Sequence, residues 1–475
     1  MKTRVQGKAR GALVLGALVG GLAGCALSKP PEHAEVVQQA LAPGTKLPSG
    51  WTAQPGASAA DVGGGWLKTF HDPGLEAVVT EAIARNIDLR AAAAVVQMAQ
   101  ASVRVAGSHL WPHVNGKLGA GTSFTEHRDG RYDATQVFGD VSWEVDVWGR
   151  VRAEKAASYA DYESVALDYA FARQSLAATT GKAWYQAIEA RQLLELAGQS
   201  VGVYQELYVL VKRREDAGKV SDLDVAQASA NLNDAQSERA KAQGAYGEAR
   251  RALELLLGRY PAAEIAIAQT FAPLPPPVGA GIPSALLTRR PDLLAAERKV
   301  LQAFRLHEAA KLSLLPRFTL ALEAGRLIDS VLTILQINPW MAHGAVGADI
   351  PIFQGGRLQA QIHVASAQQA QAIAAYGSVV LSAFGEVENA LMDEHLTIER
   401  LKIGESALSD RNVALKLVRV RFDAGSVDLL SVLQIQAAQI ASQSNVIKLR
   451  SAGLANRIDL HLALGGSFDM SPASQ

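Results

Sequence analysis

The sequence predicts a mixed α and β fold, in which a long α-helical barrel continues a transmembrane β-barrel to which each chain contributes four strands. Three observations lead to this prediction. Segments long enough to cross a membrane alternate apolar and polar residues, as a strand with one lipid-facing and one wet face does. Long stretches rich in Ala, Glu, Gln and Arg follow these segments and predict helices. The whole arrangement also occurs twice along the chain.

The repeat is recognised from matching residues at a nearly constant offset. Two pairs match at an offset of 207 (357 − 150 and 425 − 218) and two at 204 (292 − 88 and 316 − 112). We interpret the chain as a tandem duplication of about 200 residues, and such a repeat determines the fold before any local pattern does. The pairs are Arg150 with Arg357, Gly218 with Gly425, Asp88 with Asp292, and Pro112 with Pro316.

Residues 1–24 have the pattern of a lipoprotein signal peptide, with a basic start, a short apolar core at Gly11–Leu22 and small residues before Cys25. The core is too short for a spanning helix, which needs about 20 apolar residues. Cys25 is the only cysteine, so no internal disulfide is expected, and a thioether-linked lipid on it explains its presence. An ordinary signal peptide with a chance cysteine is the alternative. Ala26 favours sorting to the outer membrane of a Gram-negative bacterium.

Residues 25–72 predict an extended tether that leads away from the lipid anchor, because the segment up to about Gly65 is rich in Pro, Gly and Ala. We expect packing onto the body of the protein to begin at Trp66–Phe70. Asp72–Pro73 then precedes a helix.

The first repeat occupies residues 73–262. Its helical start leads into a β-hairpin at 113–147, in which both arms alternate and Asp129–Gly130 is a turn signal that places the tip in water. A long helix pair follows, and a Pro-rich connector at 263–282 joins the two repeats. The predicted elements are a helix at 74–110, strands at 114–125 and 135–147, and helices at 151–216 and 221–257.

The second repeat, residues 283–465, has the same order of a helix, two strands and a long helix pair, and a tail follows at 466–475. The loop at 328–340 is more apolar than its counterpart in the first repeat. The predicted strands are at 317–327 and 341–352, and the long helices are at 358–423 and 428–464.

Four strands cannot close a barrel alone. Strands span hydrocarbon only as closed barrels, because every backbone group needs a partner there, and the smallest common barrels have about eight strands. Identical chains must therefore share the barrel. Two chains would give eight strands with little lumen and three would give twelve with an open one, so the sequence predicts an oligomer and leaves both open. Outside the signal peptide we find no uncharged apolar run of about 18 residues and expect no spanning helix.

The predicted helices are unusually long. Residues 151–216 would extend about 100 Å at a rise of about 1.5 Å per residue. Small and short polar residues recur along these helices and allow neighbouring helices to approach closely, as in sheets of coiled coils. An ordinary helical bundle is the alternative, but helices joined directly to barrel strands favour a tube that continues the barrel.

The composition argues against some functions. The chain has 46 basic and 46 acidic residues, which gives no electrostatic case for binding nucleic acid. Charged residues make up 19% of the chain, below the quarter or so that is typical of soluble domains. A low charged fraction is expected of a chain with lipid-facing and intersubunit surfaces.

The candidate catalytic and metal sites are weak. His109 and His113 have the helical spacing of a metal-binding pair, but Pro112 lies between them and a strand follows. Glu386 and Glu388 are two residues apart on a predicted helix and do not face each other. We therefore predict no enzyme, no metal and no cofactor other than the covalent N-terminal lipid.

Six segments of the chain carry a resemblance to a known family. They are the lipobox at Cys25 and the segments SWEVDVWGR, AGKVSDLDV, GIPSALLTRRPDLLAAE, GADIPIFQGGRL and RFDAGSVDLLSVLQIQ. They span nearly the whole chain and resemble the TolC-like outer-membrane factors of tripartite export systems, specifically the NodT-type lipoproteins that serve resistance-nodulation-division pumps. The resemblance implies a homotrimer with a twelve-stranded barrel, a periplasmic helical tunnel, and docking with a periplasmic adaptor and an inner-membrane pump.

The resemblance also implies a role for the turns between the paired long helices, which lie at the periplasmic tip of the family's channels and form a closed aperture. Leu430 matches the family's constricting apolar position. One turn further, Gln434 stands where the family often has an acidic ring, and Ala437 replaces a frequently basic residue. We expect an apolar, amide-lined constriction, with simple helix packing as the alternative for Leu430. The tip residues, which are also the expected adaptor contacts, are Arg214, Asp216, Gly218, Arg421, Asp423 and Gly425.

The local sequence at these turns makes three further predictions. Gly218 and Gly425 suit the left-handed position that ends a helix. Ser221 and Asp428 are expected to cap the returning helices. An ion pair is expected within each tip, and exposed pairs of this kind are often worth under about 1 kcal/mol. These pairs are Arg214 with Asp216 and Arg421 with Asp423.

Two hypotheses of different classes follow. The first is a passive outer-membrane exit duct for drugs or other small molecules, driven by a partner pump. The second is a structural or adhesive envelope lipoprotein that conducts nothing. A porin-like free channel and the exit duct of a one-step protein secretion system are subordinate possibilities. Single-channel recording of the purified protein distinguishes the conducting from the non-conducting hypothesis.

Overall fold

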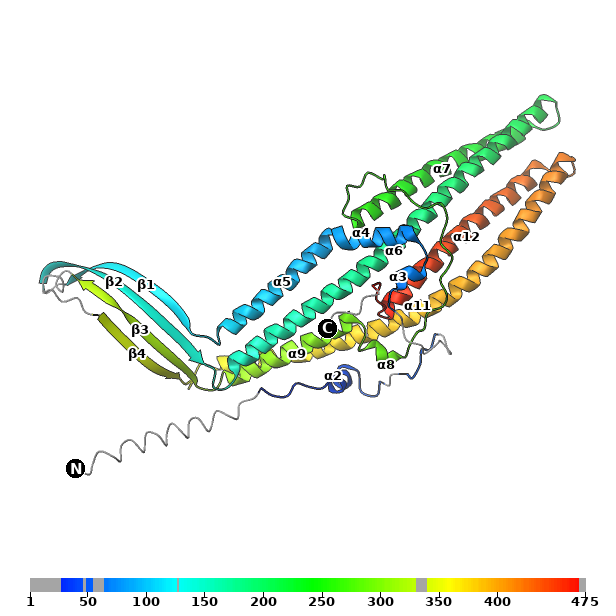
Figure 1. Cartoon of the computed structure of the whole chain (residues 1–475). Coiled ribbons are helices and arrows are strands. Elements are labelled where there is room, and N and C mark those ends of the chain that lie inside the picture. Colours follow the sequence, from blue (N-terminus) through cyan, green and yellow to red (C-terminus); the bar gives the residue numbers. More distant parts are fainter. Residues whose placement is uncertain (1–26, 46–47, 54–63, 126–127, 330–339, 470–475) are drawn as a thin grey trace, which may run out of the picture. The chain divides into compact units, whose positions relative to one another are not determined.

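The structure is a computed structural model that describes residues 27–45, 48–53, 64–125, 128–329 and 340–469 (Figure 1). The chain divides into two compact units. The sheet unit comprises residues 1–45, 94–167 and 295–378, and the helical unit comprises residues 46–93, 168–294 and 379–475.

The duplication is visible in elements of equal length. The helices α5 and α9 each have 22 residues, α6 and α11 each have 67, and α7 and α12 each have 35. The first residues of α6 and α11 differ by 207 (357 − 150), and those of β1 and β3 differ by 204 (317 − 113). The tandem repeat that the sequence predicts is therefore confirmed. The helices are α2 (His33–Ala40), α3 (Trp66–Thr69), α4 (Pro73–Arg85), α5 (Ile87–Ser108), α6 (Arg150–Asp216), α7 (Asp222–Leu256), α8 (Pro283–Leu286), α9 (Pro291–Leu312), α11 (Arg357–Asp423) and α12 (Leu429–Ala463), and the strands are β1 (His113–Thr125), β2 (Arg128–Val145), β3 (Arg317–Asp329) and β4 (Trp340–Asp349).

The sheet unit contains one antiparallel sheet with the strand order β1-β2-β3-β4, so β1 and β4 are its edges (Figure 1). Two strands end earlier than the alternation predicts. β2 ends at Val145, because the next residue, Asp146, accepts N–H groups of the first turn of α6 instead of continuing the strand. β4 ends at Asp349, its last residue paired with β3, and Pro351 beyond it has no N–H to continue the ladder.

The helical unit has an apolar core that gathers α3, α4 and parts of α6, α7 and α12. Phe70, Leu75, Tyr185 and Ile458 are among its fully buried members. Asp72 caps α4, accepting the N–H groups of the first turn and also the Trp184 indole N–H at 3.0 Å. The predicted helix start after Asp72 is therefore confirmed, and the cap is tied into the core.

The N-terminal segment differs from the extended tether that its composition predicts. In the sheet unit it forms α2, and Val36 is 3% exposed. In the helical unit Trp51 is 5% exposed and donates its indole N–H to the Ala280 carbonyl at 2.9 Å. The prediction that packing begins only at Trp66 is wrong, because isolated apolar residues in a Pro- and Gly-rich segment find long-range partners that local composition does not reveal.

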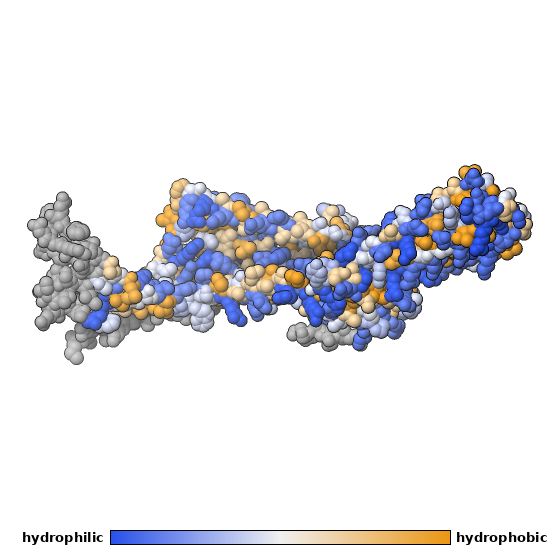
Figure 2. Space-filling model, turned by 90° about the horizontal axis from the view of Figure 1, so that it is seen from above, coloured by the Kyte–Doolittle hydropathy of each residue, from blue (hydrophilic) through white to orange (hydrophobic). Residues whose placement is uncertain are grey.

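A second correction concerns α11. By length and composition this helix contains a window apolar enough to cross a membrane, so the prediction that such a run is absent outside the signal peptide is wrong. Only 28% of that window is buried within the chain. On the face shown in Figure 2, hydrophobic residues are interspersed with hydrophilic ones along the helices. Helix surface of this kind suits contact with other helices.

Candidate functional site

The sheet register places most of the large apolar residues of the four strands on one face. Val141 of β2 lies opposite Leu322 of β3, which lies opposite Gly344 of β4. Because side chains alternate along each strand, every second position shares this face. Leu118 is 83% exposed and Val346 is 79% exposed within the chain. Exposed apolar side chains in such number form a surface suited to lipid.

The opposite face of the sheet is polar. The register places Asn115, Asp140, Glu323 and His343 in one row across the four strands. Asp140 accepts a hydrogen bond from the Asn115 amide at 3.3 Å and pairs with the Lys117 ammonium at 3.2 Å. Charged groups at this density require water, so this face is the wet side that the alternation predicts.

Phe138 is the large apolar exception among the wet-face residues of β2, and Gly325 explains its position. The two residues are register partners on β2 and β3. A Cβ on Gly325 would overlap the backbone and ring of Phe138. The aromatic ring therefore lies over the glycine of the neighbouring strand, which the sequence alternation alone could not show.

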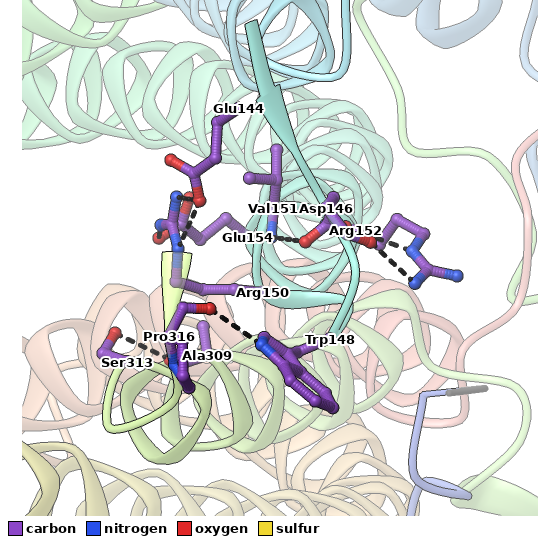
Figure 3. Close-up of polar contacts among 10 residues, drawn as sticks. All are labelled: Glu144, Asp146, Trp148, Arg150, Val151, Arg152, Glu154, Ala309, Ser313 and Pro316. Atoms are coloured by element: carbon purple, nitrogen blue, oxygen red, sulfur yellow. Dashed lines mark hydrogen bonds and ion pairs between the residues drawn. The ribbon is translucent and has the colours of Figure 1, made fainter. Parts of the chain in front are cut away.

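The junction between β2 and α6 is held by a dense polar network (Figure 3). Arg150, 15% exposed, bonds to Glu144 at 2.8 Å and to Glu154 at 2.6 Å. The Asp146 carboxylate accepts the N–H groups of Val151 at 3.0 Å and of residue 152 at 2.9 Å, which satisfies the free donors of the first helical turn. Strand and helix are thus joined through charge-assisted hydrogen bonds.

This junction is also tied to the second repeat. The Trp148 indole N–H donates to the Pro316 carbonyl at 2.8 Å, just before β3 begins (Figure 3). Gly149 has φ +87°, a left-handed conformation that favours glycine and allows the chain to turn from strand to helix.

The matching junction between β4 and α11 has few such contacts. Ile352 is 93% exposed and Phe353 is 86% exposed. Among the contacts of the described residues, the Arg357 side chain bonds only to Gln354 and Gln361, which are three and four residues away and exposed. Gly356 keeps the left-handed conformation of its counterpart, with φ +81°.

The turns between the paired long helices lie where the sequence places them. α6 ends at Asp216 and α11 at Asp423, and Gly218 and Gly425 follow with φ +68° and +74°. Ser221 and Asp428 are the N-caps of α7 and α12. Ser221 forms a capping box, and the Asp428 side chain accepts the Ser431 N–H at 2.9 Å. The hydroxyl and the backbone N–H of Ser431 together hold the pKa of Asp428 below its usual value. The predicted helix ends and caps are confirmed.

The predicted ion pairs within each tip are not the ones that form. Arg214 pairs with Asp423 of the other tip at 3.8 Å, donates to the Phe422 carbonyl at 3.4 Å, and stacks 4.2 Å from the Phe422 ring centre. Asp216 instead pairs with Lys212 at 3.8 Å. Arg421 is exposed. Proximity in the sequence suggested ion pairs within each turn. The fold instead brings Arg214 of the α6–α7 hairpin to Phe422 of the α11–α12 hairpin, where the aromatic ring and the backbone carbonyl both bind the guanidinium.

The expected aperture residues lie on one exposed face of α12. Leu430 is 54% exposed, and Gln434 and Ala437 are exposed at the following helical positions. The residues between them, Val432 and Leu433, are buried in an apolar cluster with α6, α7 and α11. This arrangement argues against packing within the chain as the role of Leu430.

One polar network near the tip was missed by the sequence analysis. Gln436 is 4% exposed and accepts a hydrogen bond from the Arg419 guanidinium at 2.7 Å, joining α12 to α11. Gln439 continues the network to Asn412 at 3.0 Å. The glutamine-rich sequence of α12 was the available signal, since buried amides need partners.

A groove of about 800 Å³ lies along α6, α7 and α12 in the helical unit. Alanine is the commonest residue in its lining, which also includes Glu189, Asp234, Glu238 and Lys241. The recurrent small residues of the long helices are the sequence signal for it, because they leave room beside the backbone.

His109 and His113, the candidate metal pair, lie just after α5 and at the start of β1. The rings of His109 and His113 lie 5.7 Å apart, and the described part of the chain holds no cluster of three or more potential metal ligands. Cys25, the predicted lipidation site, lies outside the described residues, as does most of the apolar loop at 328–340.

A comparison with protein families gives the decisive observation. The chain matches the family model described as outer membrane efflux protein over residues 78–259 and 282–466, which is most of its length and falls on the two repeats. The chain belongs to this family.

Similar proteins of the family are efflux components. The chain is 30% identical over 421 residues to the pyoverdine export outer membrane protein OpmQ of Pseudomonas aeruginosa, with 85% of this chain and 87% of OpmQ covered. It is 27% identical over 410 residues to the cation efflux system protein CusC of Escherichia coli O6:H1, with 85% and 88% covered. The structure of the outer-membrane channel OprN matches with a TM-score of 0.78 and 25% identity, covering 90% of this chain and 99% of that one.

These findings confirm the predicted fold class, location and broad function. The protein is an outer-membrane efflux duct of the TolC-like type, with long periplasmic helices and a four-stranded sheet per chain. The family and the relatives named above are channels and export components rather than enzymes.

Proposed function

We propose that three copies of this chain close a twelve-stranded barrel and helical tunnel, which serves as the passive outer-membrane exit duct of a tripartite resistance-nodulation-division efflux system. The observation that carries the proposal is the four-stranded sheet with one apolar and one charged face and two free edges, β1 and β4. Edge groups in lipid need partners, and only copies of the same chain can supply a continuous ring.

The charged face supports three copies rather than two. An eight-stranded barrel is about filled by its own side chains, whereas the wet face of this sheet carries Lys117, Asp140 and Glu323, which need water. Twelve strands provide that water-filled space. The partly exposed apolar window of α11 supplies helix surface for contact between copies.

The aperture is proposed to form at the helix tips. Leu430 and Gln434 are exposed on a face of α12 that the chain itself does not cover, which suits a constriction lined by apolar and amide groups when copies meet. Without a carboxylate ring at Gln434, closure there depends on packing rather than on charge.

The tips are also the proposed contact for a periplasmic adaptor. Asp216 and Asp423 have side chains that are 66% and 70% exposed, Arg421 is exposed, and Gly218 and Gly425 carry no side chain that would obstruct docking. Arg214 stacks on Phe422, and its side chain is only 23% exposed, so it contributes less to this contact.

The cargo is proposed to be selected by the pump. OpmQ is named for pyoverdine and CusC for cations, yet the chain is similarly related to both, at 30% and 27% identity. A wide, wet duct selects weakly, so such different cargoes are compatible with one architecture. The anchor is proposed to be a lipid on Cys25, as the lipobox indicates.

Single-channel recording of the purified, full-length protein in lipid bilayers tests the proposal, together with native mass spectrometry. We expect a trimer that conducts poorly, and Leu430→Ser is expected to raise its conductance several-fold. Leu223→Ser is the matched control, because Leu223 is the repeat counterpart of Leu430 (430 − 223 = 207) and is 75% exposed at the start of α7.

The other outcomes separate the alternatives. A monomer that conducts no ions under any condition would support the structural lipoprotein. Conductance with drug tolerance that is independent of any pump would support a free channel, and loss of an exported protein upon deletion would support a one-step secretion duct.

A further inference from the structure

The apolar face of the sheet carries an arginine near the outer end of β3. Counted outward from the junctions with the helices, Arg326 is the first charged residue on this face of the described strands. Its register partners are Val137 of β2 and Trp340 of β4, which share the face. An arginine at the middle of a lipid-facing barrel surface is strongly destabilising, whereas one near the membrane interface costs little.

The position of Arg326 along β3 places it at the outer edge of the hydrocarbon layer. It follows Phe318, which lies on the apolar face at the periplasmic end of the strand, by eight residues (326 − 318 = 8). At about 3.4 Å per residue and a tilt of about 40°, this separation is about 21 Å along the membrane normal. The apolar band of such barrels is about 25 Å tall. The long arginine side chain covers the remaining distance and reaches the headgroups of the outer leaflet.

Trp340 contacts the guanidinium at this level. The Arg326 Cζ lies 5.5 Å from the Trp340 ring centre, a cation–π contact, and Trp340 is 75% exposed. Tryptophan is typical of membrane interfaces, where its ring meets the acyl chains and its N–H reaches water. The ring covers one side of the guanidinium but supplies no negative charge.

The described strands supply no counter-charge to Arg326 on this face. Its neighbours one step along the register are Thr135, Gly139, Ala324 and Ala342, which are all uncharged. The Arg326 Nε is buried, and it has no hydrogen-bond partner within the described structure. A buried guanidinium donor without an acceptor is unfavourable, so the site is complete only when an anion binds there.

A second copy of the chain would not supply this anion. In the proposed ring, β1 of one copy follows β4 of its neighbour. The residues that β1 presents on the apolar face include Val114, Gly116, Leu118 and Ala120, and none of these carries a charge. The anion must therefore come from the membrane that surrounds the barrel.

We propose that Arg326 and Trp340 form a binding site for a phosphate group of an outer-leaflet lipid. A guanidinium binds phosphate through two parallel N–H donors, and lipid phosphates lie at the depth of this site. The indole ring contacts the acyl chains of the same lipid. The inference rests on the proposed barrel, in which the apolar face meets lipid, and it is independent of the cargo and of the partner pump.

Native mass spectrometry of the full-length protein in dodecyl maltoside micelles tests the site. Two probes are added in separate samples, lipid A with both of its phosphates and the same lipid A after enzymatic removal of the phosphates. We expect the wild type to retain the phosphorylated probe at least fivefold more often than the dephosphorylated one. Equal retention of the two probes would overturn the inference, and this comparison needs no variant.

Arg326→Gln tests whether the preference comes from this guanidinium. We expect the preference to fall at least fivefold, and Arg326→Lys, which keeps the charge but lacks the planar fork, to have an intermediate effect. Arg317→Gln is the matched control, because it removes the same group from an exposed position at the periplasmic end of the same strand, on the opposite face. An unchanged preference in Arg326→Gln, or an equal loss in Arg317→Gln, would overturn the assignment.

Trp340→Leu distinguishes the role of the ring from that of the charge. We expect a twofold to threefold loss of the preference, smaller than in Arg326→Gln, because the guanidinium remains. A larger loss in Trp340→Leu than in Arg326→Gln would overturn the phosphate assignment.

Trimer mass and single-channel conductance of the same preparations separate this site from the duct. Both should be unchanged in Arg326→Gln. A conducting wild-type trimer with no preference for the phosphorylated probe would overturn the lipid site alone. A wild-type protein that neither forms trimers nor conducts would overturn the duct, and with it the barrel on which the site depends.

Discussion

The two strand-to-helix junctions occupy equivalent places in the duplicated chain but are built differently. At an offset of 207, the Asp-Val-Trp-Gly-Arg sequence of the first junction becomes Phe-Gln-Gly-Gly-Arg in the second. The turn glycine and the arginine are retained. Asp146, which caps α6, becomes Phe353, and Trp148, which bonds to the Pro316 carbonyl, becomes Gly355.

This difference shows that the first junction is completed by its own chain and the second is not. Every anchoring side chain of the first has a partner, whereas Ile352 and Phe353 of the second are 93% and 86% exposed. Exposed apolar groups next to a free sheet edge suit contact with another copy. The two junctions therefore have different roles. The first stabilises the subunit, and we propose that the second joins subunits.

The double variant Ile352→Ser, Phe353→Ser is expected to have the largest effect. Burial of a large apolar side chain contributes about 1.5–3 kcal/mol, and a closed trimer contains three such sites. We expect trimer formation to fall by more than tenfold in native mass spectrometry. Tyr260→Ser, which removes an 87% exposed side chain just after α7, should leave the trimer intact. A normal trimer in the double variant would contradict the proposal that the second junction joins subunits.

Acid should reveal a second difference between the repeats. Glu254 and His461 are equivalent (461 − 254 = 207), and both are buried, at 2% and 4% exposure. Glu254 accepts three backbone N–H groups, and these hold its pKa below the usual value although burial alone would raise it. Burial and the nearby Arg457 lower the pKa of His461 to about 4, and in the described structure neither ring nitrogen has a hydrogen-bond partner.

The two groups lose their contribution in different pH ranges. The unfolded chain protonates His461 near pH 6.5 and the folded chain only near 4, so stability falls between these values, by roughly 3 kcal/mol. Glu254 stabilises the folded chain at pH values above its usual pKa of 4.5, and this stabilisation is lost only as the pH falls below about 4.5. Urea unfolding at pH 7.5 and 5 should show about 2 kcal/mol of this loss in the wild type and much less in His461→Phe. An equal loss in that variant would assign the effect to other groups.

The arginines of the two junctions provide a matched pair of smaller effect. Arg150→Ala leaves Glu144 and Glu154, both partly exposed, without their charge-assisted bonds, which should cost about 1–2 kcal/mol in the free energy of unfolding. Arg357→Ala removes exposed contacts to Gln354 and Gln361 and should cost under about 0.5 kcal/mol. Denaturant titration measures both, and equal costs would show that the junctions do not differ as described.

The arginines of the tips should show the smallest difference. Arg214 stacks on Phe422 and bonds to its carbonyl, whereas its counterpart Arg421 is exposed (421 − 214 = 207). Arg214→Ala should speed hydrogen exchange near the end of α6 by about fivefold, which corresponds to about 1 kcal/mol. Arg421→Ala should change it little. A larger increase in hydrogen exchange in Arg421→Ala than in Arg214→Ala would mean that Arg421, in the second repeat, stabilises the tip.

Local patterns predicted the features that depend on local physics. Strand alternation, the turn glycines Gly218 and Gly425, and the caps Ser221 and Asp428 follow from neighbouring residues, and all of them are found. The repeat offset fixed the order of the elements. Together these features amount to most of the fold, because a duplicated, strongly periodic chain leaves few alternatives.

Contacts between distant segments could not be predicted in the same way. Nothing near Arg214 indicates that Phe422 will be its partner, and nothing near Ser28 indicates Glu308. The composition of the N-terminal segment predicted a free tether, whereas Trp51 and Val36 find buried sites far along the chain. Leu430 and Gln434 would form the aperture only when subunits assemble. The structure of one chain shows only that both residues are exposed.

The free edges of the four-stranded sheet have a genetic consequence. In the proposed trimer each pore draws its wall from three separately translated chains. A cell that makes equal amounts of normal protein and of a variant able to assemble but unable to open would have only about one wholly normal pore in eight. Such alleles should therefore be dominant, whereas alleles that prevent strand β4 from meeting its neighbour should be recessive.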